Sequence, residues 1–583
     1  MKTNDFLKPT FSDPAIVSSS QEGRDSQHYR EILIDLSSQI KREQYQVSFT
    51  IPIIGFAYYW NPTRTGDLSL PIGGKEEVIT KVNYSMPIFS FFDEQSINQF
   101  TFAFSEVVQP IKTSVEVIEE TASIKVSASI SRRDLKEGHL VMYYSTFQDS
   151  FSDAIKSARN WIYSATNITP SDVPEFAGKP IYSTWYSFHQ QLSQEKIANQ
   201  SRNFKDYRLS SIIVDDGWQT DDVHRGYSFA GDWKISKKKF PDMGESVKNM
   251  QLLNVKYLLW LSLPYVGRHS SHWDTLQNKL LFFDKQQDAG ILDIRFPEVR
   301  KHLIKSAVNL TETLNLDGLK IDFLDVFDVS NADEKTNAGW DIQNLNDAFV
   351  TFLEELSRKL KWFKPDFLIE FREDYFGPFL NSVGNIFRVK DCPNNYIKNR
   401  ISIANLRLLC PKAAVHSDML MWNSQESTEA AALQVINCLF GTPQISVKLD
   451  ELSLSKQRML KFWLRYIDEN RAILQNGEFK APFPQNNYPV ISAESTEKMI
   501  VGKFQSNGMV RINTASTRTI DIINGTFDQK ITVNISDNCN GLVKTFSTEG
   551  RQVSMKVGNY AKGYYDFSVP KAGLLRIEVK QIG

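Results

Sequence analysis

Hydrophobic and polar residues alternate along this chain with two different periods, and the changes of period divide it into three regions. From residue 1 to about 170, apolar residues recur at every second position in stretches such as QYQVSFTIP and SIKVSASI. A period of two places successive side chains on opposite faces of a β-strand. Turn-forming runs such as PIGGKEE separate these stretches. We therefore expect an N-terminal β-sandwich over residues 1–170.

The pattern changes over residues 171–478, where short apolar runs alternate with longer amphipathic stretches. The runs are PIYSTWYSF, SSIIVDDGW, VKYLLWLSLP, GLKIDFLD, DFLIEFRED, NIFRVKD, AAVHSDML and TPQISVKL. Helical periods, for example in VRKHLIKSAVNLTETLN and LNDAFVTFLEELSRKLKWF, lie between most of them. Strands that alternate with helices form parallel sheets, and eight such units predict a central catalytic (β/α)8 TIM barrel.

Residues 479–583 return to the period of two, in KMIVGKFQ, MVRINTAS, KITVNIS and LLRIEVK. We expect a small C-terminal antiparallel β-sandwich there. The predicted fold is thus multidomain, with a β-sandwich on each side of a TIM barrel.

Composition and charge exclude several classes of partner. The 583 residues carry a net charge of −1, which gives no reason to expect nucleic acid or a membrane surface as partner. The first twenty residues lack the apolar segment of a secretory signal, and no stretch reaches the length of a membrane-spanning helix. The four cysteines lack CxxC spacing, which fits a reducing compartment, so we expect a cytoplasmic protein.

Polar and aromatic side chains gather at the carboxyl ends of the predicted barrel strands, where TIM-barrel active sites lie. In chain order they are Trp185 and Tyr186, Asp215, Asp216 and Trp218, Trp260, Lys320 and Asp322, Arg372, Arg388 and Asp391, and His416 and Asp418. Charged residues at the end of a single strand could be explained by a buried ion pair. The same polarity at the ends of seven strands predicts a single site that binds sugar hydroxyls, with tryptophans stacking on apolar sugar faces.

Lys320 and Asp322 lie in GLKIDFLD, which otherwise reads as a buried apolar strand. Residues two apart share one face of a strand, so both are expected to point into the barrel mouth. The cation would keep Asp322 ionised, as the nucleophile of a retaining glycosidase must be. Asp325 lies on the opposite parity, beyond the strand end, and is expected to be a loop or capping residue.

A retaining glycosidase also needs a protonated acid roughly 5 Å from the nucleophile. Asp391, at the end of the sixth predicted strand, is the candidate. Glu373 and Asp374, after the fifth strand, are its rivals.

Several motifs in a fixed order resemble glycoside hydrolase family 36, the α-galactosidase family of clan D. They are IVDDGWQ, GDWKISKKKFPDM, LDIRFPEVRKHL and GLKIDF. The resemblance runs over about residues 180–450, and the order of sandwich, barrel and sandwich also matches. It implies that Asp215, Asp216, Lys320 and Arg388 bind sugar, that Asp322 is the nucleophile and that Asp391 is the acid/base. It also matches Trp185 and Tyr186 to an aromatic pair, and Trp60 in YYWNP to an aromatic residue from the N-terminal domain.

Two departures from the family pattern concern the site. The expected spacing between the arginine and the acid/base aspartate is four residues, whereas RVKD places Arg388 and Asp391 three apart. Such a spacing puts them on opposite faces unless the strand has ended or bulged. After the fifth strand, FREDYFGP replaces the Cys–Ser–Gly–Gly loop that is frequent in the family, so the sugar itself is less constrained than the reaction.

The sequence therefore predicts a retaining α-glycosidase, first of all an α-galactosidase, that acts on an oligosaccharide or glycoside without a cofactor or metal. The alternatives are a raffinose-synthase-like α-galactosyl transglycosidase and an α-N-acetylgalactosaminidase. A catalytically inactive sugar-binding protein is an alternative of a different class. The family resemblance also implies a possible homo-oligomer.

Overall fold

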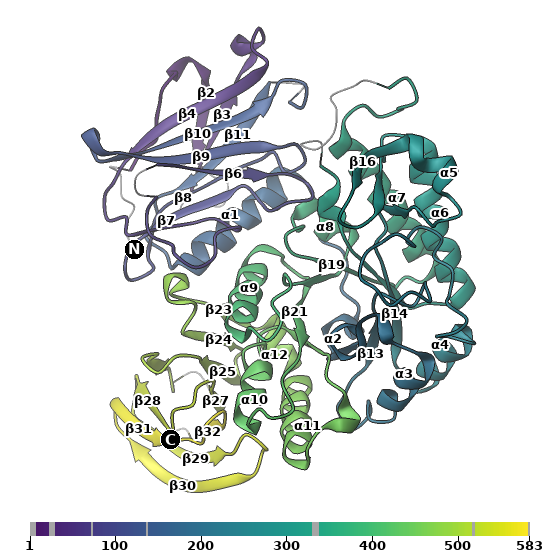
Figure 1. Ribbon diagram of the computed structural model, residues 1–583. Coiled ribbons are helices and arrows are strands. Elements are labelled where there is room, and N and C mark those ends of the chain that lie inside the picture. Colours follow the sequence, from purple (N-terminus) through teal and green to yellow (C-terminus); the bar gives the residue numbers. More distant parts are fainter. Residues whose placement is uncertain are drawn as a thin grey trace.

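The computed structural model describes residues 7–22, 29–71, 74–135, 138–328, 337–515 and 519–580. Figure 1 shows three parts that follow the chain: a purple-to-blue β-sandwich, a teal-to-green α/β barrel and a yellow β-sandwich. This order confirms the predicted fold class. None of the helices within the described ranges combines the length and apolar character needed to cross a bilayer.

The N-terminal part consists of two antiparallel sheets with a core rich in phenylalanine and isoleucine. In spatial order, the first sheet contains β1 (Thr10–Phe11), β4 (Gln44–Pro52), β10 (Ser123–Ser131), β9 (Ile111–Ile118) and β6 (Lys75–Thr80). The second contains β2 (Val17–Glu22), β3 (Arg30–Asp35), β11 (His139–Ser145), β8 (Asn98–Phe104), β7 (Ile88–Phe92) and β5 (Tyr58–Trp60). Burial alternates along β4, from exposed Gln44 to buried Tyr45 onward, as the period of two predicts for a strand with one face in a core.

The central part is a closed barrel of eight parallel strands. They are β12 (Ile181–Ser183), β13 (Ser211–Val214), β14 (Lys256–Leu261), β18 (Gly318–Ile321), β19 (Leu368–Arg372), β20 (Ile386–Arg388), β21 (Ala414–Leu420) and β22 (Thr442–Ile445). Each of the eight predicted runs supplies one of these strands. The insertion between β14 and β18 contains a small antiparallel sheet of β15 (Tyr265–Gly267), β17 (Ala289–Leu292) and β16 (Leu280–Asp284), with α5 (Trp273–Leu276).

Helices connect the barrel strands, and several of them begin at a side chain that caps the first turn. The helices of this region are α2 (Trp185–Phe188), α3 (Gln194–Ser201), α4 (Met243–Leu252), α6 (Pro297–Leu314), α7 (Leu345–Phe363), α8 (Pro378–Val383), α9 (Tyr396–Leu409), α10 (Thr428–Ile436), α11 (Leu454–Glu469) and α12 (Arg471–Asn476). Asp242, Asn344 and Ser453 accept hydrogen bonds from the first-turn amides of α4, α7 and α11. Such caps satisfy backbone donors that have no partner inside the helix.

The barrel interior changes from apolar to polar along the strands. At the amino-terminal end, one layer packs against Ala177 of the short helix η4 (Glu175–Gly178) and consists of Ile181, Ile213, Leu258, Leu368, Ile386 and Ala414. Two residues further along the strands stand Ser183, Asp215, Trp260, Glu370, Arg388 and His416, which are also buried. Because residues two apart share a face, the interior ends in charged groups at the carboxyl end of the barrel.

The C-terminal part is a sandwich of a larger and a smaller sheet. The larger contains, in spatial order, β23 (Glu478–Lys480), β24 (Val490–Glu494), β25 (Lys498–Lys503), β27 (Thr519–Asn524), β32 (Leu574–Lys580), β29 (Cys539–Phe546) and β30 (Gln552–Tyr560). The smaller contains β26 (Val510–Ile512), β28 (Lys530–Ile535) and β31 (Gly563–Ser568). The other strand pairs of this sandwich are antiparallel, as predicted, but β25 with β27 and β26 with β28 are parallel.

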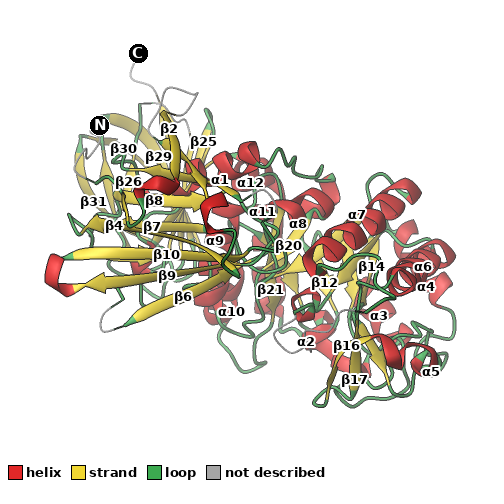
Figure 2. Ribbon diagram, turned by 90° about the horizontal axis from the view of Figure 1, so that it is seen from above, coloured by secondary structure: helices red, strands yellow, loops and turns green. Residues whose placement is uncertain are grey.

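The N-terminal sandwich is joined to the barrel by α1 (Phe151–Ala165), which contacts β7, β8 and β11 on one side and α9 on the other. In the view of Figure 2, the long strands of this sandwich extend to one side of the helices that surround the barrel. The barrel shares one continuous hydrophobic core with α1 and with the face of the second sheet that packs on α1, which includes Ile88, Phe92 and Tyr143.

Candidate active site

Asp322 lies directly after β18, at the carboxyl end of the barrel, and both of its carboxylate oxygens accept hydrogen bonds. Oδ1 accepts from Arg372 Nε at 2.6 Å and from the Phe323 amide at 2.8 Å. The single proton of the Tyr375 hydroxyl is shared between Oδ1 at 3.3 Å and the Ile321 carbonyl at 3.1 Å. Oδ2 accepts from the indole nitrogen of Trp260 at 2.9 Å. The side chain is 9% exposed, so the carboxylate is held in one orientation in a largely dry environment.

The charge of Asp322 is stabilised by three cations, Lys320 of β18 itself, Arg372 of β19 and Arg388 of β20. Burial alone would raise its pKa, but Arg372, and after it Lys320 and Arg388, hold the pKa well below its usual range. Arg372 is the strongest of these influences. The expectation that Lys320 is the cation that keeps Asp322 ionised therefore holds only in part.

Lys320 instead makes its direct contact with Asp215. Its Nζ donates to Asp215 Oδ2 at 2.7 Å, and both side chains are buried. The adjacent Asp216 accepts hydrogen bonds from Gln190 and Gln219, each at 2.9 Å. Burial raises the pKa of Asp216 to about 6. Of the two aspartates of the DDGW motif, Asp215 thus contacts Lys320, which the sequence places in the same site, while Asp216 is held by the two glutamines.

Arg388 and Asp391 meet despite their spacing of three residues. The strand β20 ends at Arg388, so the alternation of faces no longer applies to the residues that follow. Arg388 Nη1 lies 2.8 Å from Oδ1 of Asp391 and 2.8 Å from Oδ1 of Asp418. The Asp391 side chain is 55% exposed, whereas that of Asp418 is fully buried. Asp391 is therefore the carboxylate of this group that solvent and a ligand reach.

The pKa of Asp391 is set by opposing charges around it. The Arg388 guanidinium lowers the pKa, while burial and the negative charge of Asp322 act to raise it. The net effect is a pKa below the ordinary value. Lys390, the nearest cation in sequence, points to Asp374 and forms an ion pair with it.

The two rivals of Asp391 have other partners. Glu373 is buried, accepts a hydrogen bond from the Lys390 amide and has a pKa raised to about 7 by burial. Asp374 is held by Lys390. Of the three carboxylates after β19 and β20, Asp391 is the most exposed.

Two aromatic residues from the short helix α2 border the same group. The Tyr186 hydroxyl donates to Asp418 Oδ2 at 3.1 Å. Trp185 packs edge-on against His189, with their ring centroids 4.7 Å apart, and lies beneath the guanidinium of Arg225 at 5.6 Å. Trp185 is only partly buried, so part of its indole surface is available to a ligand.

Three of the predicted sugar ligands are directed elsewhere. Trp60 is buried in the sandwich and packs edge-on against Phe151 of α1, with centroids 5.4 Å apart. Trp218 is fully buried and donates to the Trp260 carbonyl at 2.9 Å. His416 lies 2.7 Å from the Ala177 carbonyl at the closed end of the barrel, and burial lowers its pKa to about 4. The described contacts of these three side chains include neither Asp322 nor Asp391.

Tyr375 and Tyr227 have no role in the sequence prediction, and Trp260 was named there only among the side chains at the strand ends. Trp260 and Tyr375 contact Asp322 directly. Tyr227, from the long loop after β13, stacks on Tyr265 with centroids 4.9 Å apart, and its pKa is raised by burial and by the nearby Asp216 and Asp322. Strand parity would have found Trp260, which faces inward with Leu258, but nothing in the sequence places the loop residue Tyr227.

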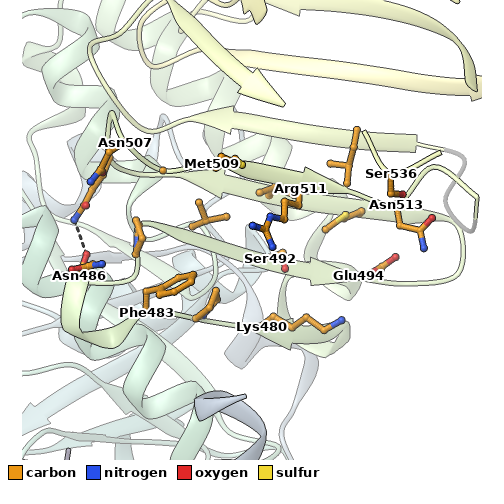
Figure 3. Close-up of a pocket in the computed structure, with 18 residues that line it drawn as sticks. Lys480, Phe483, Asn486, Ser492, Glu494, Asn507, Met509, Arg511, Asn513 and Ser536 are labelled. Carbon is orange, nitrogen blue, oxygen red and sulfur yellow. Dashed lines mark hydrogen bonds between the residues drawn. The ribbon is translucent and has the colours of Figure 1, made fainter. Parts of the chain in front are cut away.

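A separate cavity of about 810 Å³ lies in the C-terminal sandwich (Figure 3). Its lining includes Phe483, Met499, Met509 and Arg511, from β25, β26 and the loops beside them. Among the residues that line it, Glu494 is the single carboxylate. A retaining mechanism needs two carboxylates on either side of the scissile bond, so this cavity does not supply glycosidase chemistry.

Sequence comparisons point to glycoside hydrolases with this type of barrel. Residues 173–431 match the sequence model of the glycosyl hydrolases family 31 TIM-barrel domain. The α-galactosidase Mel36A of Lactobacillus acidophilus is 23% identical over 150 residues, which are 24% of this chain and 20% of that protein. The α-galactosidase AgaA of Geobacillus stearothermophilus is 26% identical over 93 residues, 15% of this chain and 12% of that protein. The matched segments thus span a fifth or less of these relatives.

Solved structures extend the similarity over the whole chain. AgaA from Geobacillus stearothermophilus, a family 36 α-galactosidase bound to 1-deoxygalactonojirimycin, superposes with a TM-score of 0.65 at 12% identity, covering 98% of this chain and 86% of that one. The α-galactosidase from Lactobacillus brevis gives 0.62 at 13% identity, covering 99% and 85%. A family 31 sulfoquinovosidase from E. rectale gives 0.60 at 11% identity, covering 97% and 89%.

The fold is that of the glycoside hydrolases with a TIM barrel between two β-sandwiches. Within this class the chain resembles the family 36 α-galactosidases in both sequence and fold, which confirms the resemblance predicted from its motifs.

Proposed function

We propose that this protein is a retaining α-glycosidase, and specifically an α-galactosidase that hydrolyses terminal α-galactosides of oligosaccharides. The observation that carries the proposal is the pairing of a buried, ionised Asp322 with the exposed Asp391 at one end of the barrel. The named relatives are α-galactosidases. Variants of Geobacillus AgaA have also been crystallised with raffinose and with stachyose, which supports an oligosaccharide as substrate here.

In the first step, Asp322 attacks the anomeric carbon of the terminal sugar. The glycosidic C–O bond breaks, and the leaving oxygen takes the proton of Asp391. The product is a glycosyl ester of Asp322. Asp215, Asp216, Lys320 and Arg388 surround the reacting sugar and supply donors and acceptors for its hydroxyl groups.

In the second step, Asp391 acts as a base. Formation of the ester removes the negative charge of Asp322, and this charge is one that raises the pKa of Asp391. The pKa of Asp391 therefore falls between the two steps, which suits a group that donates a proton first and accepts one from water next. Water then attacks the anomeric carbon and releases Asp322 as a carboxylate.

Transfer to a second sugar instead of water would use the same two carboxylates. Trp185, with its partly exposed indole, is the residue beside the site that offers an apolar platform for an acceptor sugar. The proportion of transfer to hydrolysis can be measured in the same assay.

The test is a comparison of aryl α-galactoside, α-glucoside and α-N-acetylgalactosaminide with the purified protein, followed by raffinose as a natural oligosaccharide. We expect the α-galactoside to have the highest kcat/KM. Preference for the acetamido sugar would replace the galactosidase assignment with the N-acetylgalactosaminidase alternative. Absence of turnover on all of them, with sugar binding retained, would favour a sugar-binding protein without catalysis.

A further inference from the structure

We infer that Arg372 is a positioning residue of the nucleophile rather than a sugar ligand, and that together with Tyr375 it selects Oδ2 of Asp322 as the attacking oxygen. This inference rests on the proposed glycosidase function. It changes the role predicted for Arg372 from its place at the end of a barrel strand.

The two oxygens of Asp322 differ in the number of donors that they face. Oδ1 accepts from Arg372 and Phe323, and it shares the single proton of the Tyr375 hydroxyl with the Ile321 carbonyl. Among the described residues, Oδ2 accepts from Trp260 alone. A carboxylate oxygen has about two lone-pair sites, so the two N–H donors already fill Oδ1, while Oδ2 keeps a lone pair for the new bond to the anomeric carbon.

The guanidinium of Arg372 is directed toward groups of the protein itself. Its Nε donates to Asp322, its Nη1 donates to the Glu373 carbonyl at 3.1 Å and its Nη2 faces Asp325 at 3.8 Å. Arg372 Cζ also lies 5.3 Å from the centroid of the Phe323 ring and 5.5 Å from the centroid of the Tyr375 ring. The side chain is 13% exposed. These contacts hold the guanidinium against the Asp322 carboxylate.

Asp325 completes this arrangement from the short helix η7 (Leu324–Val326). Its Oδ1 is buried and, among the described residues, finds no hydrogen-bond donor at normal distance. Its charge nevertheless faces Arg372. The guanidinium thus lies between two carboxylates, which fixes its position along the line that joins them.

The same contacts serve both chemical steps. As Oδ2 forms the ester bond, Oδ1 becomes its carbonyl oxygen and keeps the hydrogen bonds from Arg372 and Tyr375. When water displaces the carboxylate, the guanidinium stabilises the negative charge that returns to Asp322. Loss of Arg372 is therefore expected to slow hydrolysis of the glycosyl ester as well as its formation.

The experiment compares Arg372→Met, Arg372→Lys and Tyr375→Phe with the wild type on an aryl α-galactoside across pH. Arg358→Met, on the exposed side of α7, is the matched control because no ion pair of Arg358 occurs among the described contacts. For Arg372→Met we expect kcat to fall by roughly 10²-fold or more and the acid limb of kcat/KM to move up by about 1 pH unit or more, because an opposite charge at this distance shifts a carboxyl pKa by about 1–3 units. Arg372→Lys should restore part of both.

Tyr375→Phe is the variant least expected to disturb folding, since it removes one hydroxyl. We expect it to lower kcat by about tenfold, the effect of one charge-assisted hydrogen bond, with KM nearly unchanged. If Arg372→Met raised KM but left kcat and the acid limb of the pH profile at their wild-type values, Arg372 would be a sugar ligand. That result would overturn the inference and leave the proposed function intact. A wild type that hydrolyses none of the glycosides would overturn the proposed function together with the inference.

Discussion

At the scale of single residues, the charge state of Asp391 decides when it can act as an acid. Arg388 at 2.8 Å lowers its pKa, and the charge of Asp322 acts in the opposite direction. The protonated form therefore predominates only at acid pH in the free protein. A carboxylate without Arg388 and Asp322 beside it would not have these two opposing influences on its pKa.

We predict from this balance that kcat/KM for an unactivated oligosaccharide is highest below pH 7. Its alkaline limb reports loss of the Asp391 proton. For the variant Asp391→Gly, we expect kcat/KM for raffinose to fall by roughly 10²–10⁴-fold, the usual contribution of general acid catalysis. An aryl galactoside with a good leaving group should lose much less in the first step. The measurement is the pH profile of each substrate.

Equal losses on both substrates would contradict the role of Asp391 as the proton donor. An unchanged alkaline limb in Asp391→Gly would assign that limb to another group. Glu373, with a pKa raised to about 7, would then be the next candidate.

The residue-level prediction of the site depended on strand parity. Parity correctly brought together Asp215, Lys320 and Asp322 because they face the barrel interior at one end. It failed for His416, which lies in the same layer as Asp215 but whose ring bonds to the Ala177 carbonyl. Parity gives the face of the strand on which a side chain lies and not the direction in which it turns inside the barrel.

At the scale of elements, the strand β18 carries the nucleophile and approaches its neighbours unusually closely at Gly318. A Cβ at this position would lie 2.6 Å from the Leu368 carbonyl oxygen and 2.7 Å from Leu258 Cγ. The GLKID motif therefore begins with glycine because β14 and β19 leave no room for a side chain.

We predict that Gly318→Ala destabilises the barrel by about 1–3 kcal/mol, as overpacking does in other cores. This corresponds to a fall in melting temperature of several degrees, roughly 2–4 °C per kcal/mol for a part of this size. Because β18 also carries Lys320 and Asp322, kcat/KM should fall as well. Thermal unfolding and an aryl galactoside assay measure the two effects.

Gly244→Ala in α4 is the control for this substitution. Its added Cβ would meet nothing closer than Asp242 Oδ1 at 3.4 Å, and alanine favours a helix over glycine. We expect its melting temperature to be equal to or above that of the wild type. If Gly318→Ala behaved in the same way, the close approach of the strands would not be the reason for glycine.

Element order and type were readable from the sequence because the two hydrophobic periods are distinct in most regions. The eight apolar runs became the eight barrel strands, and β20 ended at Arg388 early enough to let Asp391 turn toward it. The ends of strands are set by contacts with neighbouring elements. That is why the three-residue spacing could not be resolved from the pattern.

At the scale of the whole molecule, the N-terminal sandwich supports the loops that follow the catalytic strands. Asn83 Nδ2 donates to the carbonyl oxygens of Leu324 at 2.8 Å and Phe327 at 3.0 Å. Lys81 forms an ion pair with Asp328 at 2.7 Å, and the Ser85 amide donates to the Asp374 carbonyl at 3.3 Å. The segments after β18 and β19 are thus held from a different domain.

We predict that Asn83→Ala lowers the free energy of unfolding by about 1–3 kcal/mol, because it leaves two buried carbonyl groups without a donor. It should also lower kcat more than it raises KM, since η7 adjoins Asp322 and Asp325. Denaturant unfolding and steady-state kinetics check both parts. Asn249→Ala, at an exposed position of α4, should change neither.

Wild-type kinetics in a folded Asn83→Ala variant would show that the sandwich does not influence the site. Contacts of this kind join residues more than 240 positions apart in sequence. No periodic pattern reports them, which is also why the sequence suggested Trp60 and not Asn83 as the contribution of the N-terminal domain.

The central claim, that Asp322 is the nucleophile, is tested most directly by trapping its ester. An activated fluorinated α-galactosyl donor, whose glycosyl-enzyme hydrolyses slowly, is incubated with the wild type, and the protein is digested and analysed by peptide mass spectrometry. The account predicts one added fluorogalactosyl group, located on Asp322 and absent from Asp322→Ala. An adduct on a different carboxylate, or an active wild type that inverts the anomeric configuration without forming one, would contradict it.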